Sequence, residues 1–536
     1  MYKKLTKLTL LLSFFVIAGG LYLLLNFHFK LINYPYQLDA REGAPFLIAT
    51  EMMRGNFPYV LSNLPYLTDV FGVLYYLFGI PFLKVFGIHL SSMRILSAVC
   101  IFIVIILFYL ILRKNKINVR TSLFFTLIFY SLNLFTIIPI VRPDSLGFLL
   151  FILSLYIPVW YSFSRKSLLL SLFFCLLAYL TKSYFAISFP FIVLFLFFFH
   201  SKIRAVKYAI LFFLALISLQ ITLYLFFNFY LIGTLSAQLS STVNNFSHLV
   251  FQLNFYFITL LLIPSVLLIL VIIRYIVLKR NLLVRLIENP ELFLTGLDFK
   301  NKHQPLFRFQ LQPDVHWFYF ILGLFLIVFK LGGHTGQFGV YLIHFLSFPF
   351  LVIIAKKVNS TLTTFPLILF IVLVLMLTRV LNIHKLDRVI RPTSEFNHIV
   401  HEIKKSKKVL ATPILASVLV EQHKYVYASG LTEYFFYVPA LKNNYGLPTI
   451  IAKVKDKVLL PTIMQSEFQI RSYLEDIQKN VVAKKFDVIY LDNTIYDDWM
   501  VDPKLVKKYY RIVDTTNVVM YASFQENKIF KLVPRN

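Results

Sequence analysis

The sequence predicts a polytopic α-helical membrane protein of about 11 transmembrane helices with a small C-terminal α/β soluble domain. Hydrophobic residues make up 58% of the 536-residue chain and charged residues only 15%. A water-soluble protein of this size needs a more polar surface than that composition provides. The acids are also unevenly placed, because residues 1–384 hold nine Asp and Glu and residues 385–536 hold sixteen. We therefore expect a transmembrane domain over 1–384 and an aqueous domain over 385–536.

About eleven apolar segments are long enough to cross a bilayer, or nearly so. The first, over 8–27, follows three lysines and lacks a small-residue cleavage site, so we expect a retained helix and not a removed signal peptide. The others lie at 93–112, 121–138, 145–163, 168–181, 184–199, 208–229, 254–278, 316–331, 338–355 and 361–381. The two segments between 168 and 199 are short and would also fit one bent hairpin, which leaves the number of crossings open by one or two.

The charge of the connections predicts the orientation. With the N-terminus inside, about twenty of the cations in 1–384 fall on the cytoplasmic side and about nine on the outer side, as the positive-inside rule requires. An odd number of crossings then places the C-terminal domain outside, in a multi-pass protein of the plasma (inner) membrane. The same rule accounts for the net charge of +28 without nucleic acid as a partner, since no nucleic-acid-binding pattern accompanies that charge.

The first outer loop, residues 28–92, holds most of the acids on the outer side. An ionisable group beside lipid is costly, so each one calls for a reason. We expect two amphipathic or re-entrant helices in this loop, over 45–54 and 70–86. Asp39 and Glu42 stand three residues apart where the first of these helices begins. That spacing suits carboxylates that face the same side, and it suits a helix cap with Arg41 as an internal partner.

The C-terminal domain alternates short elements typical of a small α/β fold. A helix is expected to begin at Thr393 or Ser394 and to run to 406, with a second helix over 466–479. Strands are expected over 408–411, 425–427 and 486–490, and a β-hairpin over 511–533. The domain has no Gly-rich phosphate loop, no cysteine and no tight His/Asp cluster. These absences favour a binding or scaffolding role for it over a second active site.

Several short motifs of the transmembrane part resemble one known family. They are the acids after the first helix, the G-x-x-P-Y pattern at Gly55–Tyr59, the pairs Pro65-Tyr66 and Tyr75-Tyr76, the segment Arg142-Pro143-Asp144, and the segment Lys330-Leu331-Gly332-Gly333-His334 followed by Tyr341 and His344. In these motifs and in its layout the chain resembles the GT-C membrane glycosyltransferases, of the type of protein mannosyltransferases and the aminoarabinose transferase of lipid A. It departs from them in one respect: many relatives have an adjacent acidic pair, whereas Ala40 and Arg41 separate the two acids here.

The resemblance implies transfer of a sugar, with inversion, from a polyprenyl-phosphate carrier to a glycan, lipid or protein acceptor on the outer face. It implies catalytic carboxylates at Asp39 and Glu42, with Asp39 as the general base. Cations on the outer side are candidates to bind the donor phosphate: Arg41, Arg142, Lys182, Lys330 and His334. Substrate-binding roles are implied for Tyr66, Asp144, Tyr341 and His344. No cofactor is expected, and a divalent metal is not favoured because the ligand set is thin.

Other interpretations remain open at the level of the sequence. Lys182 and Lys330 would also suit snorkelling from helix ends, Arg142 and Asp144 a structural bridge, and His344 a core position. A transporter or flippase of lipid-linked sugars is the leading alternative function, although the sequence lacks the internal repeats typical of such folds. A lipid-linked polysaccharide polymerase or ligase is a further alternative. Such enzymes usually place the main outer loop late in the chain, and here it comes first.

Overall fold

The computed structural model describes residues 2–60, 71–134, 139–227, 314–331, 340–358, 393–427, 460–492, 501–519 and 526–536, together with a few isolated residues between 63 and 250. Two of the predicted crossings, 254–278 and 361–381, lie outside the described residues. So do His334 and the side chains of Lys330 and Tyr341.

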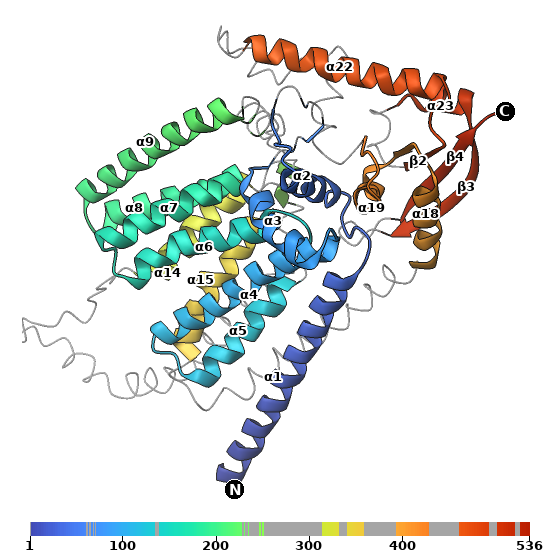
Figure 1. The fold of residues 1–536 in the computed structure, drawn as a ribbon. Coiled ribbons are helices and arrows are strands. Elements are labelled where there is room, and N and C mark those ends of the chain that lie inside the picture. The colour runs from blue at the N-terminus through green and yellow to red at the C-terminus, as the bar shows by residue number, and fades with distance from the viewer. Residues whose placement is uncertain are drawn as a thin grey trace, which may run out of the picture.

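The apolar segments of the sequence form the helices of a bundle, in which neighbours along the chain such as α4 and α5, or α6 and α7, run in opposite directions (Figure 1). These helices are α1 Tyr2–Asn33, α4 Leu90–Lys114, α5 Val119–Leu134, α6 Asp144–Trp160, α7 Arg165–Thr181, α8 Ser188–Phe199, α9 Lys202–Phe226, α14 Val315–Gly323 and α15 Val340–Val358. A 3-10 turn, η2 (Ser183–Ile187), joins α7 to α8, and a π-helical stretch, η4 (Leu324–Leu331), continues α14. Every predicted segment outside 254–278 and 361–381 thus contains a helix.

Among the described residues, α4 and α9 are the helices long and apolar enough to cross a membrane by length and composition. Most apolar side chains of α9 are exposed, up to 75% at Leu225, which is the pattern of a helix that faces lipid or a further element. Over their described side chains, α5, α6, α8, α14 and α15 are shorter apolar helices. The molecule is therefore mainly helical with two candidate membrane spans, and the total of about eleven crossings stays a prediction.

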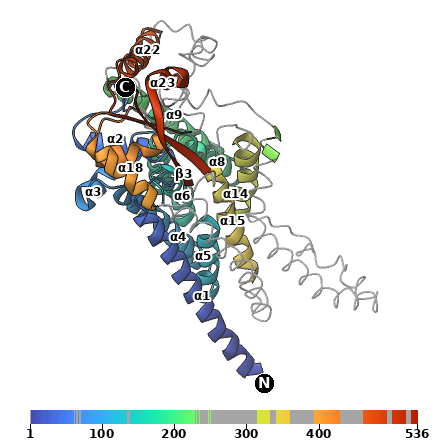
Figure 2. The same cartoon turned by 90° about the vertical axis from the view of Figure 1, so that its right-hand side faces the viewer.

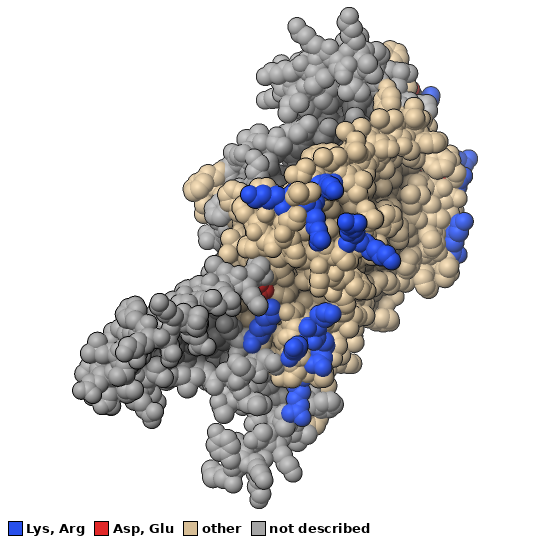
Figure 3. Space-filling view, turned by 90° about the vertical axis from the view of Figure 1, so that its left-hand side faces the viewer, with Lys and Arg blue, Asp and Glu red and all other residues tan. Residues whose placement is uncertain are grey.

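One end of the bundle is rich in cations, and we call it the basic end. Lys114 lies over the ring of Trp160 at 5.7 Å, which brings the ends of α4 and α6 together. Lys356 and Asp314 form an ion pair of 3.0 Å between α15 and α14 at the same end. The connections here carry Arg113, Lys114, Lys116, Arg120, Arg165, Lys166, Lys202, Arg204 and Lys207. Figure 3 faces this side of the molecule, on which Lys and Arg far outnumber Asp and Glu.

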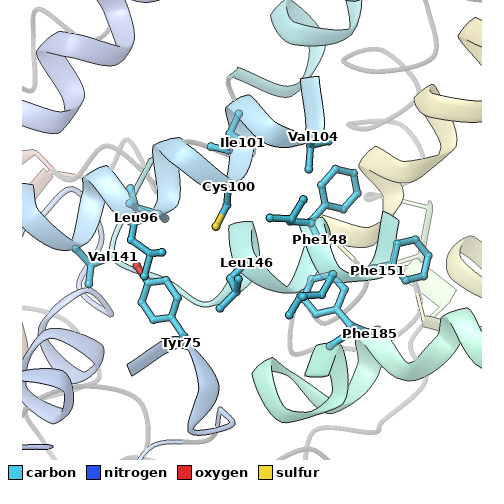
Figure 4. Close-up of a cluster of buried hydrophobic side chains, with 14 of the residues drawn as sticks. Tyr75, Leu96, Cys100, Ile101, Val104, Val141, Leu146, Phe148, Phe151 and Phe185 are labelled. Carbon is cyan, nitrogen blue, oxygen red and sulfur yellow. The ribbon is translucent and has the colours of Figure 1, made fainter. Parts of the chain in front are cut away.

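The bundle is held together by packed aromatic and aliphatic side chains. Figure 4 shows the part of the core where side chains of α4 and α6 converge, among them Cys100 and Phe148. Phe151 of α6 contacts Phe185 of η2, with ring centroids 6.3 Å apart. A side chain at Gly147 would collide with the Phe185 ring, so this glycine permits the close approach of η2 to α6.

The C-terminal domain is a small α/β unit, as predicted. Its described elements are α18 Thr393–Lys405, β1 Val409–Ala411, η5 Pro413–Leu415, α19 Ala416–Glu421, α22 Leu460–Val482, β2 Val488–Asp492, α23 Pro503–Tyr509, β3 Tyr510–Val519 and β4 Glu526–Pro534. The sheet order is β1-β2-β4-β3, with β1 and β2 parallel and the other pairs antiparallel. Figure 2 shows the domain at the opposite end of the molecule from the N-terminus of α1.

One predicted strand of this domain is wrong. Residues 425–427 belong to no described strand. The ring of Tyr425 instead stacks on Tyr66 of the first loop, with centroids 5.0 Å apart, and Val426 is buried in the core that the loop and the domain share. The aromatic and β-branched character of this segment therefore reflects packing between two parts of the chain and not strand pairing.

The connection between α1 and α4, residues 34–89, is the predicted first outer loop and is called the first loop below. It contains α2 (Gly43–Met53) and α3 (Leu74–Phe86). We predicted that both helices are amphipathic or re-entrant. Residues 43–52 are all buried, so α2 is not an amphipathic surface helix, and the re-entrant alternative stays a prediction. Figure 1 shows α2 between the bundle and α19 of the C-terminal domain, so both of its sides are covered. Only α3 has one buried and one exposed face.

Specific contacts fasten the C-terminal domain to the first loop. The Tyr36 ring stacks on Phe396 at 4.3 Å between centroids. The backbone N–H of Ser417 donates to Oε1 of Gln37 at 2.9 Å, and Arg54 lies 3.0 Å from Nδ1 of His423. Because these contacts come from both ends of the loop segment 36–54, the domain and this segment form one packed unit.

Candidate functional site

Asp39 lies in a tight turn just before α2 and is buried, with 7% of its surface exposed. Its Oδ1 accepts a hydrogen bond from the backbone N–H of Arg41 at 2.9 Å, and its Oδ2 pairs with Nη1 of Arg142 at 2.8 Å. Burial alone would raise the pKa of Asp39, but the positive charges of Arg142 and Arg41 and these hydrogen bonds outweigh it and hold the pKa below 3.8. The carboxylate is therefore ionised at neutral pH.

Arg142 links Asp39 to a second carboxylate. Its Nε lies 3.1 Å from Oδ2 of Asp144, the first residue of α6, where the helix dipole favours a negative charge. Oδ1 of Asp144 in turn accepts hydrogen bonds from Nζ of Lys182 at 2.5 Å and from the Tyr184 hydroxyl at 2.9 Å. Asp39, Arg142, Asp144 and Lys182 thus form a buried row of alternating charge, called the charged row below.

Lys182, in the connection between α7 and η2, closes the charged row. Its side chain is only 4% exposed, and Nζ also lies 4.0 Å from the centroid of the Phe71 ring. Burial lowers the pKa of Lys182 to about 8, although the charge of Asp144 acts in the opposite direction. The snorkelling alternative is therefore wrong for Lys182, because its amine is directed into the protein and paired.

A glycine brings the first loop to the end of α7 and so places Phe71 over Lys182. The backbone N–H of Gly72 donates to the carbonyl of Thr181 at 3.0 Å. A side chain on Gly72 would collide with the neighbouring carbonyl of Leu180, which is backbone and unable to turn aside. The segments 71–72 and 180–182 can pack this closely only because position 72 has no Cβ.

Glu42 does not join Asp39. It is fully buried, and its oxygens take hydrogen bonds from the guanidinium of Arg94 and from the backbone N–H groups of Leu38 and Val141. It occupies the residue before α2, but its side chain makes no capping hydrogen bond to that helix. The Glu42 carboxylate is thus paired with Arg94 and with loop backbone, apart from the charged row, and its predicted catalytic role stays a prediction.

The remaining predicted residues lie in different places. Arg41 is close to the charged row, and Tyr66 is at the contact between the first loop and the C-terminal domain. Arg41 is half-buried, and its positive charge acts on both Asp39 and Lys182. Tyr66 packs against Tyr425, so its ring belongs to the contact between the first loop and the C-terminal domain. His344 is fully buried inside α15. Lys330, His334 and Tyr341 keep their predicted roles as predictions, since their side chains lie outside the described residues.

Sequence reasoning missed Arg94 and Tyr184. Arg94 lies inside the predicted crossing 93–112, and an arginine within an apolar run is a signal of a buried partner that we did not use. Tyr184 offered no such signal, because one tyrosine among the 32 of this sequence does not stand out. The described residues contain no group of three or more His, Cys, Asp or Glu side chains that could hold a metal ion.

At one end of the bundle, the arrangement joins an ionised carboxylate to two buried cations and a half-buried arginine. Such a group can accept a proton at Asp39 and can bind an anion through the cations. No protein-family model matches this chain, and no curated protein or solved structure is significantly similar to it.

Proposed function

We propose that this protein is a membrane glycosyltransferase of the GT-C type that moves a sugar from a polyprenyl-phosphate carrier to an acceptor on the outer face. The observation that carries the proposal is the charged row. Four ionisable side chains from the first loop, the start of α6 and the end of α7 meet in a buried position at one end of the bundle. Buried ionisable groups in an apolar helical protein are expensive and are therefore typical of functional sites.

The proposed chemistry is an inverting displacement at the anomeric carbon. The acceptor hydroxyl oxygen forms the new bond to that carbon, and its proton passes to Asp39. The bond from the carbon to the carrier phosphate breaks, and the phosphate leaves with the electron pair. Lys182, Arg142 and Arg41 supply positive charge for that departing phosphate. Asp39 suits the base because its carboxylate is ionised at neutral pH.

The proposal includes the predicted placement in the membrane. About eleven crossings, a cytoplasmic N-terminus and an extracytoplasmic C-terminal domain would put the charged row at the outer face of the plasma (inner) membrane. Two features support this. The helices α4 and α9 are long and apolar enough to span, and the cation-rich basic end lies opposite the charged row along the bundle. Lys330 and His334 are proposed as further phosphate ligands, and Tyr66, Asp144, Tyr341 and His344 as substrate contacts.

The test uses the purified full-length protein with a panel of polyprenyl-phosphate sugars, and it measures the acceptor-dependent release of carrier phosphate. We expect Asp39→Asn to lower the rate by about 10²- to 10⁴-fold, the usual size of a general-base effect. Asp314→Asn is the matched control, because it makes the same change in an ion pair at the basic end. It should keep the wild-type rate.

Two results would contradict the proposal. Full activity of the Asp39→Asn variant would remove the proposed base. Movement of a lipid-linked sugar across vesicles without its consumption would replace the transferase with a transporter.

A further inference from the structure

A second buried ion pair lies beside the charged row, against the backbone that carries Asp39 and Arg142. Arg94 of α4 and Glu42 of the first loop are both fully buried. Their contact is bidentate, with Nη2 of Arg94 2.8 Å from Oε2 of Glu42 and Nε 3.0 Å from Oε1. Two parallel hydrogen bonds between a guanidinium and a carboxylate fix the orientation as well as the distance of the pair.

The same carboxylate also holds the backbone next to both Asp39 and Arg142. Oε2 of Glu42 accepts the backbone N–H of Leu38 at 2.6 Å, and Oε1 accepts that of Val141 at 2.7 Å. Leu38 directly precedes Asp39, and Val141 directly precedes Arg142. One side chain therefore fixes the two segments whose next residues form the first ion pair of the charged row.

Arg94 anchors this arrangement to the end of α1. Besides its two bonds to Glu42, its guanidinium donates to the carbonyls of Leu31, Tyr34 and Tyr36. These bonds use all five N–H donors of the guanidinium. Since none is left over for a ligand, Arg94 is suited to fixing the loop and not to binding a substrate.

We propose that Glu42 and Arg94 are positioning residues that hold the Asp39 carboxylate against the Arg142 guanidinium. The inference rests on the proposed function for its kinetic consequences and on the hydrogen bonds alone for its structural ones. The charged groups that act on Asp39 are Arg41 from its own loop and Arg142 from the connection before α6, with Asp144 and Lys182 beyond Arg142 and the Glu42–Arg94 pair behind. If the Glu42–Arg94 pair is lost, the contact between Asp39 and Arg142 weakens. Less positive charge then offsets the burial of the Asp39 carboxylate.

The first experiment measures the pH dependence of kcat/KM in the Glu42→Gln variant, which keeps the size of the side chain and loses its charge. We expect the acidic limb of the profile to move to higher pH, because Asp39 then holds its proton more tightly. We expect kcat to fall by about 10²-fold, the effect of a displacement on the order of 1 Å at a reacting group, with a smaller change in the KM for the donor. Asp314→Asn again serves as the control and should leave the limb in place.

Glu42→Asp is the second variant, for the case that the glutamine variant does not fold. It keeps the charge and shortens the side chain by one methylene, so we expect the limb to move in the same direction by a smaller amount. A rate that falls equally at every pH in these variants, with the limb unmoved, would mean that Glu42 only stabilises the fold, and would overturn the proposal.

A labelling experiment separates this inference from the proposed function. Val141 is fully buried, and the two cysteines of the chain, Cys100 and Cys175, can be replaced to leave Val141→Cys as the only thiol. We expect a water-soluble maleimide to label this thiol at least about tenfold faster when Glu42→Gln is added, because the segment is no longer held. Unchanged labelling would overturn the proposal that Glu42 holds this segment in place. If the wild type turns over no sugar donor, the proposed function fails. Faster labelling of the Glu42→Gln variant would still support the positioning role of Glu42.

Discussion

The buried amine of Lys182 makes the stability of the protein depend on pH in a way that can be measured. Its pKa is lowered to about 8 in the folded protein, from 10.5 in the unfolded chain, with burial as the main cause. Between these two pH values the unfolded chain binds the extra proton, so the free energy of unfolding rises with pH. Below pH 8 both states are protonated and the cost of burying the charge is present in full. Above 10.5 both are neutral and it is gone.

The size of the effect follows from the two pKa values. They differ by about 2.5, and each unit corresponds to about 1.4 kcal/mol, which gives about 3 kcal/mol of stability regained across the range. Lys182→Met removes the titrating group, and Lys182→Arg keeps a charge that does not titrate in this range. We expect the difference in unfolding free energy between wild type and either variant to change by about 3 kcal/mol in favour of the wild type between pH 8 and pH 10.5.

The assay is an equilibrium unfolding titration of the purified protein in mixed detergent micelles at a series of pH values. Other groups that titrate in this range are common to all the proteins, and they cancel in the difference. Lys356→Met is the matched control, since it removes a lysine from an ion pair whose lysine side chain is 32% exposed. Its difference from the wild type should change less with pH than that of Lys182→Met, because the Lys356 side chain is partly in contact with water. A constant difference between the wild type and Lys182→Met over the whole range would refute the reasoning.

Two further changes test how the site is held in place. Gln37 donates to the backbone carbonyl of Asp39 and accepts a backbone N–H from α19. Gln37→Ala should therefore lower the unfolding free energy by about 1–3 kcal/mol and speed proteolysis of the C-terminal domain. Unchanged proteolysis would mean that this bond does not hold the domain. Gly72→Ala should lower both stability and donor affinity, because the new methyl group meets a backbone carbonyl of α7 beside Lys182. At Gly79→Ala the new methyl group would collide only with the flexible end of a methionine, so this variant should cost less in a thermal unfolding assay. Equal losses would contradict the packing argument.

The helices of the bundle could be predicted from the sequence because a long apolar run has few other solutions in a chain with so little charge. Their ends could not, since helices continue beyond the apolar run wherever the next residues still hydrogen-bond. The first helix was predicted over 8–27 and spans Tyr2–Asn33. The strand predicted over 425–427 failed for a related reason. Val426 is buried and the ring of Tyr425 stacks on Tyr66, and these contacts fit the sequence pattern as well as a strand would.

For the candidate site, the sequence identified the members of the charged row but not their pairing. The acids were selected because an ionisable group beside lipid is costly, and the cations because the resemblance implies a carrier phosphate for them to bind. That Asp39 meets Arg142, more than a hundred residues away, depends on how the first loop packs against α6. The local pattern also could not tell Asp39 from Glu42. Both are acids in the same turn, and the difference between them arises from Arg94, which reaches only Glu42.

The two buried ion-pair systems differ in what they leave available, and this difference is the best physical argument for where chemistry occurs. In the Arg94–Glu42 pair every guanidinium donor is used by protein groups, so the pair can fix the backbone but offers nothing to a ligand. The charged row ends in Lys182, whose pKa burial lowers to about 8, and lies beside Arg41, which is only half-buried. A row of buried charges is weak evidence of stability, since apolar side chains of the same volume would often serve as well. Its cost is better explained if an anion that reaches Arg41 and Lys182 completes the balance of charge, which is the role that a carrier phosphate would have.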